Sequence, residues 1–111
     1  MSTVLVGNLV NNPELKFTDS GKEYAVFSVA VTKGIEEKYT SFFECSAWGS
    51  LGKNLSGLDK GTRVLLSGVF NQRSHEDKNG NKRLEVEFKV FAGGPELTWA
   101  QASVTKMDIY A

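Results

Sequence analysis

Two aromatic residues in the stretch 41–49, SFFECSAWG, occupy positions where a strand would carry polar side chains. Successive side chains of a strand point to opposite faces. One face is apolar and carries Phe43, Cys45 and Ala47. The other carries Phe42, Glu44, Ser46 and Trp48. Flat rings on an open face can stack on the bases of single-stranded nucleic acid, whatever the sequence. The alternative is that a helix or a partner chain covers these two rings, since exposed apolar patches mark interfaces of any kind.

Positive side chains that could neutralise phosphates gather near this segment and along a later one. They are Lys33 and Lys38 before it, Lys53 just after it, and Arg73, Lys78, Lys82 and Arg83 in the later segment. We interpret residues 73–83 as a positively charged arm despite Glu76 and Asp77. A merely solvated charged face is the competing interpretation.

Catalytic chemistry has little support in the sequence. His75 is the only histidine, and no second histidine or cysteine lies near it to complete a metal site. Cys45 is the only cysteine, which excludes an internal disulfide and a metal–thiolate cluster. We therefore predict no enzyme activity, no cofactor and no metal. The enzyme alternative is a small β-barrel hydrolase that would use His75 with Glu76 or Asp77.

The composition indicates one folded domain. The chain has 111 residues, of which 41% are hydrophobic and 23% charged. Thirteen Lys and Arg balance thirteen Asp and Glu, so the total charge does not indicate a nucleic-acid binder. The question is therefore whether the positive side chains gather on one face of the protein. No membrane span or signal peptide is visible, and we expect a cytoplasmic protein without membrane contact.

Short extended segments separated by turn residues predict an all-β fold. The expected strands cover 3–9, 14–18, 23–33, 41–48, 61–73 and 82–91, and 96–110 also reads as extended. Leucines at helical spacing predict one short helix over 50–58. Asn79-Gly80 predicts the turn of a long hairpin. Core packing is expected of four further aromatics, Tyr24, Phe27, Phe70 and Phe88.

Strands at this spacing, with one helix between the fourth and fifth, favour a five-stranded Greek-key barrel of the OB-fold type. The barrel would carry a long β-hairpin and an extra C-terminal strand. One face of such a barrel, with its loops, holds oligonucleotides or oligosaccharides.

The sequence resembles the bacterial single-stranded DNA-binding proteins, an OB-fold family. The resemblance runs through VLVGNL, PELKFTDSGK, FSVAVTK, TSFFECSAWGSLGKNL and the segment 58–83, and covers roughly residues 3–91. It implies sequence-independent coating of single-stranded DNA by a homotetramer in replication, recombination and repair, near the nucleoid. Residues 1–92 would form the DNA-binding domain. Residues 93–111 resemble the extra strand with which actinobacterial members clasp a neighbouring subunit.

The resemblance also implies roles for individual residues. Phe42 and Trp48 occupy stacking positions, His75 occupies the place of another tryptophan, and Arg73 matches a basic position beside it. With the cations named above, the expected DNA contacts are Phe42, Trp48, His75, Arg73, Lys33, Lys53, Lys78, Lys82 and Arg83.

Three departures from the family pattern stand out. Glu44 replaces a common arginine and should repel phosphate. The loop after Lys33 is short, with Ile35 nearest the place of a usual tryptophan. The chain ends at KMDIYA without the family's flexible linker and acidic tip, so we do not expect it to recruit replication or repair enzymes. An OB-fold protein-interaction module and a single-stranded RNA binder remain open as alternatives.

Overall fold

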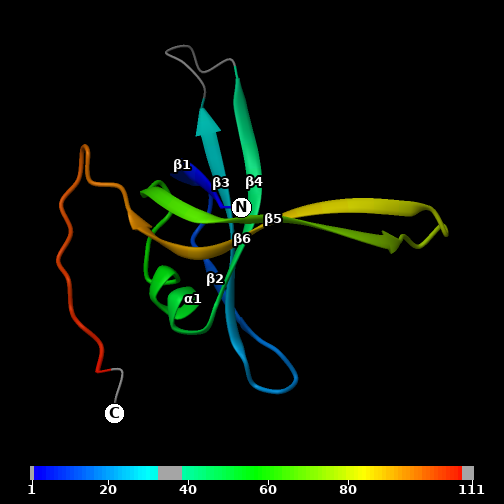
Figure 1. Cartoon of the computed structure of the whole chain (residues 1–111), viewed down its shortest axis with the longest axis horizontal. Coiled ribbons are helices and arrows are strands. Elements are labelled where there is room, and N and C mark those ends of the chain that lie inside the picture. Colours follow the sequence, from blue (N-terminus) through cyan, green and yellow to red (C-terminus); the bar gives the residue numbers. More distant parts are fainter. Residues whose placement is uncertain (1, 33–38, 109–111) are drawn as a thin grey trace.

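The computed structural model describes residues 2–32 and 39–108 and contains six strands and one helix among them (Figure 1). In chain order the elements are β1 (Thr3–Leu9), β2 (Glu14–Phe17), β3 (Glu23–Thr32), β4 (Thr40–Trp48), α1 (Gly49–Leu55), β5 (Arg63–Glu76) and β6 (Lys82–Pro95). The expected strands are all present, and the helix is shorter than its leucine spacing predicts. The only helix in the described part of the chain, α1, is too short to cross a membrane.

The strands form a ring because β1 pairs on both of its sides. The sheet order is β1-β5-β6-β4-β3-β2, and β1 also pairs with β3 through Asn8 and Leu9. Most pairs are antiparallel, but β4 and β6 run parallel over a seam of three residue pairs, Cys45 to Phe88, Ser46 to Lys89 and Ala47 to Val90. The predicted OB-fold barrel is confirmed, with β2 as a short strand added beside β3.

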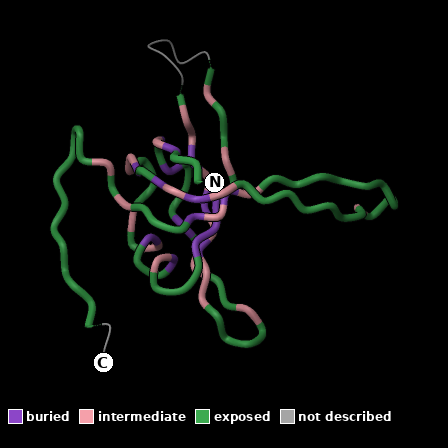
Figure 2. The backbone as a smooth tube through the Cα atoms, viewed as in Figure 1, coloured by how far each residue is buried: buried purple, intermediate pink, exposed green. Residues whose placement is uncertain are grey.

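The core fills the inside of this ring with alternate residues of the strands, and in β4 the intervening Ser46 is buried as well. Ala25, Phe27 and Val29 of β3 point inward, as do Cys45 and Ala47 of β4. Leu66 and Phe88 have no exposed surface, and Val64 and Val90 are nearly as well buried. Figure 2 shows this buried part where the strands cross, while the projecting hairpin and the C-terminal segment are exposed.

The helix packs closely against the barrel. A β-carbon at Gly52 would lie 2.2 Å from the carbonyl oxygen of Ala47, so no larger residue fits without moving the helix. Glycine normally weakens a helix by roughly 1 kcal/mol relative to alanine. Here the close approach of α1 to β4 explains its presence.

β5 and β6 continue beyond the barrel as a two-stranded arm, defined here as residues 71–87 (Figure 1, yellow). Its tip closes through the Asp77 amide, which donates to the Asn81 carbonyl at 2.9 Å, and Gly80 adopts a φ of 77°. This pattern is that of a three-residue hairpin loop ending in a left-handed glycine. The hairpin predicted from Asn79-Gly80 is confirmed.

The chain beyond Pro95 leaves the barrel in extended form. The Glu96 amide still donates to the Arg63 carbonyl of β5 at 2.8 Å. Residues 97–107 belong to no strand of this single chain and run past α1, where the Asn54 amide lies 3.1 Å from the Met107 sulfur (Figure 1, orange to red). A C-terminal strand in this segment therefore remains a prediction for an assembly of several chains. The boundary expected at residue 92 lies inside β6.

Candidate nucleic-acid interface

The outer face of β3 and β4 is organised in rows of cross-strand neighbours. The pairs are Tyr24–Trp48, Val26–Ser46, Ser28–Glu44 and Ala30–Phe42, in that order along the strands. Phe27, Val29 and the other inward residues occupy the opposite face. Both aromatic positions singled out in β4 therefore lie outside the barrel, one at each end of the strand.

Trp48 is supported by a second ring. Its indole stacks on Tyr24 with ring centroids 4.6 Å apart and an angle of 19° between the planes, and 42% of the residue is exposed. Tyr24 was expected in the core, and that prediction is wrong. Because β3 is apolar on both faces, its sequence does not show which face turns inward.

Phe42 lies at the other end of β4, opposite the small Ala30, and is 66% exposed. Phe70, another residue expected in the core, is half-exposed at the root of the arm. Its ring packs on Phe88 at 4.9 Å and on Phe43 at 5.7 Å between centroids. Core packing is confirmed for Phe27 and Phe88 and holds only in part for Phe70.

A cleft of about 660 Å³ opens beside Trp48, within the ~300–1,000 Å³ typical of ligand sites. It is lined by residues from five strands, among them Lys16, Val26, Glu44, Trp48, Arg73 and Val86. Lys16 is a cation that the sequence did not single out. It pairs in register with Tyr24, so β2 brings a positive charge to the aromatic row.

The floor of the cleft is acidic. Glu44 accepts a hydrogen bond from the Ser28 hydroxyl at 2.6 Å. Glu87 accepts one from the hydroxyl of buried Ser46 and one from the Arg73 guanidinium at 2.7 Å. These bonds hold the carboxylates in place on the face that carries the exposed rings.

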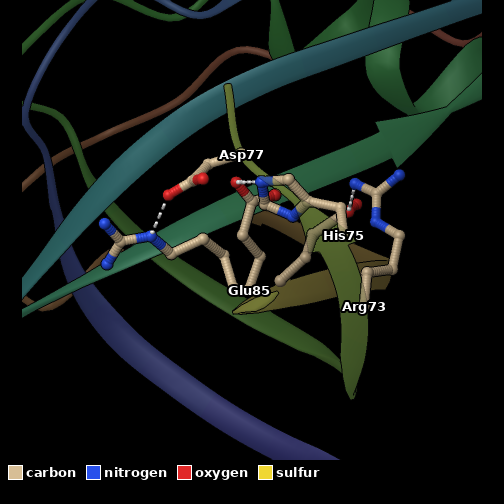
Figure 3. Close-up of polar contacts among 6 residues, drawn as sticks. Arg73, His75, Asp77 and Glu85 are labelled. Atoms are coloured by element: carbon tan, nitrogen blue, oxygen red, sulfur yellow. Dashed lines mark hydrogen bonds and ion pairs between the residues drawn. The ribbon is translucent and has the colours of Figure 1, made fainter. Parts of the chain in front are cut away.

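The arm is not a free positive surface, because both of its arginines are paired with acids of the same hairpin. Arg73 pairs with Glu87, and Arg83 pairs with Asp77 at 2.9 Å. The imidazole of His75 lies 3.5 Å from the Glu85 carboxylate (Figure 3). The expectation of a positively charged arm is therefore corrected. Lys78 and Lys82 make no ion pair with any described residue.

Asp77 organises the arm tip. Its carboxylate accepts hydrogen bonds from the Asn79 and Asn81 amides as well as from Arg83. The Arg83 side chain, helped by these backbone amides, holds the pKa of Asp77 below its ordinary value. Asp77 is thus a structural residue of the turn. Asp77 is therefore already engaged in the turn and is not available as the catalytic partner of His75 in the hydrolase alternative.

One of the lysines predicted to contact DNA, Lys53, lies away from the cleft. Lys53 lies in the last turn of α1 and does not line it. Lys33 and Lys38 lie outside the described residues, as does Ile35. The candidate interface in the described part of the chain therefore consists of the rows that contain Trp48 and Phe42, the cleft, and the cations Lys16 and Arg73.

The single cysteine lies on the other side of β4. Burial raises the pKa of the Cys45 thiol to about 12, with Glu44 and Glu87 adding to the effect. A protonated, enclosed thiol is a poor nucleophile and a poor metal ligand. No group of three metal-binding side chains occurs within residues 2–32 and 39–108.

A second aromatic site lies at the start of the C-terminal segment. The Arg63 guanidinium sits 4.6 Å from the centre of the Trp99 ring and also pairs with Glu96. Trp99 is 79% exposed. Leu97, Val104 and Met107 are exposed in the same segment.

Comparison with known proteins agrees with this geometry. Residues 1–91 match the model of the single-strand binding protein family. The chain is 40% identical to a single-stranded DNA-binding protein of Paenarthrobacter nicotinovorans, over 92% of this chain and 65% of the relative. The protein of the same name from Mycobacterium tuberculosis is also 40% identical, over 92% and 68%. The chain thus spans about two thirds of the length of these relatives.

Proposed function

We propose that this chain, which belongs to the single-strand binding protein family, binds single-stranded DNA without requiring a defined sequence. The observation that carries the proposal is the pair of aromatic positions left open on one sheet face, with Trp48 held on Tyr24 beside a cleft. Each base stacked on such a ring contributes roughly 1–3 kcal/mol. The role in replication, recombination and repair follows from the family.

Phosphate contacts supply the second part of the affinity. Lys16 and Arg73 line the cleft, where a backbone could pass between them and the rings. Lys53, Lys78, Lys82, Arg83 and His75 remain predicted contacts, as does Lys33. Since Arg73 and Arg83 already pair with acids, we expect few net phosphate contacts and a shallow dependence of affinity on salt.

We further propose that the protein works as a homotetramer. The exposed apolar residues of the C-terminal segment and of the outer barrel, such as Val4 and Leu65, would be covered by neighbouring copies. The extended segment 97–107 would add a strand to a neighbour. The protein would act without catalysis, in the cytoplasm beside the nucleoid.

The proposal is tested by tryptophan fluorescence. The chain has two tryptophans, Trp48 and Trp99, so Trp99→Phe leaves Trp48 as the only reporter while keeping a ring over Arg63. Titration with oligo-dT should quench this emission, because a stacked base contacts the indole. Matched double-stranded DNA should not quench it, and raising the salt should weaken the binding to oligo-dT.

Two outcomes would favour the alternatives. Failure to bind any single strand at low salt would reject the proposal and leave a protein-interaction module. Tighter binding to oligo-U than to oligo-dU would identify RNA as the ligand, since those two strands differ only in the 2′-hydroxyl.

A further inference from the structure

Three carboxylates line the cleft, and their surroundings differ. Both oxygens of Glu87 are engaged, one by Ser46 and one by Arg73. Glu85 faces His75 on the arm. Glu44 is engaged only through Oε1, by the Ser28 hydroxyl at 2.6 Å, and its Oε2 has no hydrogen-bond partner among the described residues. The cleft thus contains an oriented carboxylate with one unused acceptor.

The strand register places this acceptor at a defined distance from the stacking ring. The rows Tyr24–Trp48, Val26–Ser46 and Ser28–Glu44 follow one another. Each row is two residues further along the strands, or about 7 Å. The side chains of the middle row project little from the sheet, because Val26 is short and Ser46 is buried with its hydroxyl bonded to Glu87. A base lying over this row would have the Trp48 ring on one side and Glu44 at its other edge.

A carboxylate at that edge distinguishes the bases. An ionised carboxylate only accepts hydrogen bonds. Cytosine and adenine offer an exocyclic amino donor, and cytosine N4 is a known partner of Glu and Asp in base recognition. Thymine instead presents carbonyl oxygens on either side of its single ring N–H, and a carboxylate repels them.

We propose that Glu44 biases this site toward amino-bearing bases, cytosine first, over thymine. The inference rests on the proposed single-stranded DNA binding and adds a base preference to it. Glu44 would contact the base directly, while Ser28 would act as a positioning residue that holds the carboxylate.

The test compares oligo-dC with oligo-dT on the protein and on Glu44→Gln, whose amide oxygen can still accept from Ser28. The quantity is the ratio of the dT to the dC dissociation constant. Comparing this ratio between protein variants cancels the different flexibility of the two free strands. Glu44→Gln should tighten both complexes by removing phosphate repulsion, and should lower the ratio roughly fivefold, near the lower end for a specific base contact.

Two further variants complete the test. Asp59→Asn removes one negative charge on an exposed residue outside the cleft, and should leave the ratio unchanged. Ser28→Ala keeps the Glu44 charge and removes its hydrogen bond, and should lower the ratio part of the way. A ratio equal in the unmodified protein and in folded Glu44→Gln would overturn the inference while DNA binding stands. Absence of salt-dependent binding to both strands would instead overturn the proposed function, and the inference with it.

Discussion

The indole of Trp48 rests on Tyr24, so the stacking surface at this end of β4 is a pair of rings. Trp48→Ala should weaken oligo-dT binding by roughly 1–3 kcal/mol, because it removes the ring a base would contact. Tyr24→Ala should weaken binding less, since the indole remains but loses its support. Fluorescence anisotropy of a labelled oligonucleotide measures both effects.

Tyr24→Phe is the matched control, because it preserves the ring and removes only the hydroxyl. Its affinity should equal that of the unmodified protein. The role of Trp48 would be disproved by an unchanged affinity of Trp48→Ala at an unchanged melting temperature.

Cys45 provides a second test at the level of single residues. Because its pKa is raised to about 12, almost no thiolate exists in the folded protein at pH 8. A thiol reagent should therefore react with the native protein at least tenfold more slowly than with the urea-unfolded chain. Equal rates would show that the thiol is accessible. Ionisation of the unfolded chain's thiol should also lower stability as the pH rises from about 9 toward 12.

Alternation along β4 was sufficient to predict that Phe42 and Trp48 share the polar face. It was not sufficient to predict the face of Tyr24. Tyr24 and Val26 make one face of β3 apolar and Phe27 lies on the other, so no polar face identifies the outside. Lys16 was missed for another reason. Only the pairing of β2 with β3 brings it next to Tyr24, and that pairing is not visible in the sequence near β4.

The arm illustrates the same difficulty for a whole element. Its two strands and its turn were predictable from the alternation in β6 and from Asn79-Gly80. Its electrostatic character was not, because the two arginines meet acids of the same hairpin only once it is folded. Arg73 reaches Glu87, which is diagonal to its register partner Glu85, and Arg83 reaches Asp77 across the turn. A count of charges along the sequence cannot show this neutralisation.

Acid should loosen the tip of this arm. A lowered pKa means that ionised Asp77 favours the folded turn. This contribution is present above the carboxyl's ordinary pKa of 3.8 and is lost as the pH falls through the lowered folded value. Amide resonances of Asn79 and Asn81 should shift in this acidic range in an NMR titration.

Asp77→Asn separates this effect from general acid unfolding. The amide oxygen can still accept from the turn amides, but the ion pair with Arg83 is gone. The shifts at Asn79 and Asn81 should then lose their acid dependence. Persistence of the same titration in Asp77→Asn would assign it to another group.

At the scale of the whole molecule, large hydrophobic side chains are exposed both on the barrel, as at Val4 and Leu65, and in the C-terminal segment, as at Trp99. If the C-terminal segment clasps a neighbour, light scattering should give about four times the chain mass of 12.2 kDa. Trp99→Ala should weaken this assembly by about 2 kcal/mol or more, as buried tryptophans at interfaces do. Dilution series of both proteins measure the change.

Gln101→Ala, in the same exposed segment, is the control and should leave the mass unchanged. A monomer of 12.2 kDa at all concentrations would disprove the assembly. The segment itself shows a limit of sequence reasoning, because an extended pattern can be read from 96–110 while the strand that would pair with it belongs to another molecule.

The enclosed position of the single sulfhydryl also has a practical consequence. A cysteine introduced at the exposed arm tip, for example Lys78→Cys, would be the one thiol that a maleimide dye reaches at neutral pH. The dye could then report, from one known point on the molecule, when a DNA strand passes beside the hairpin.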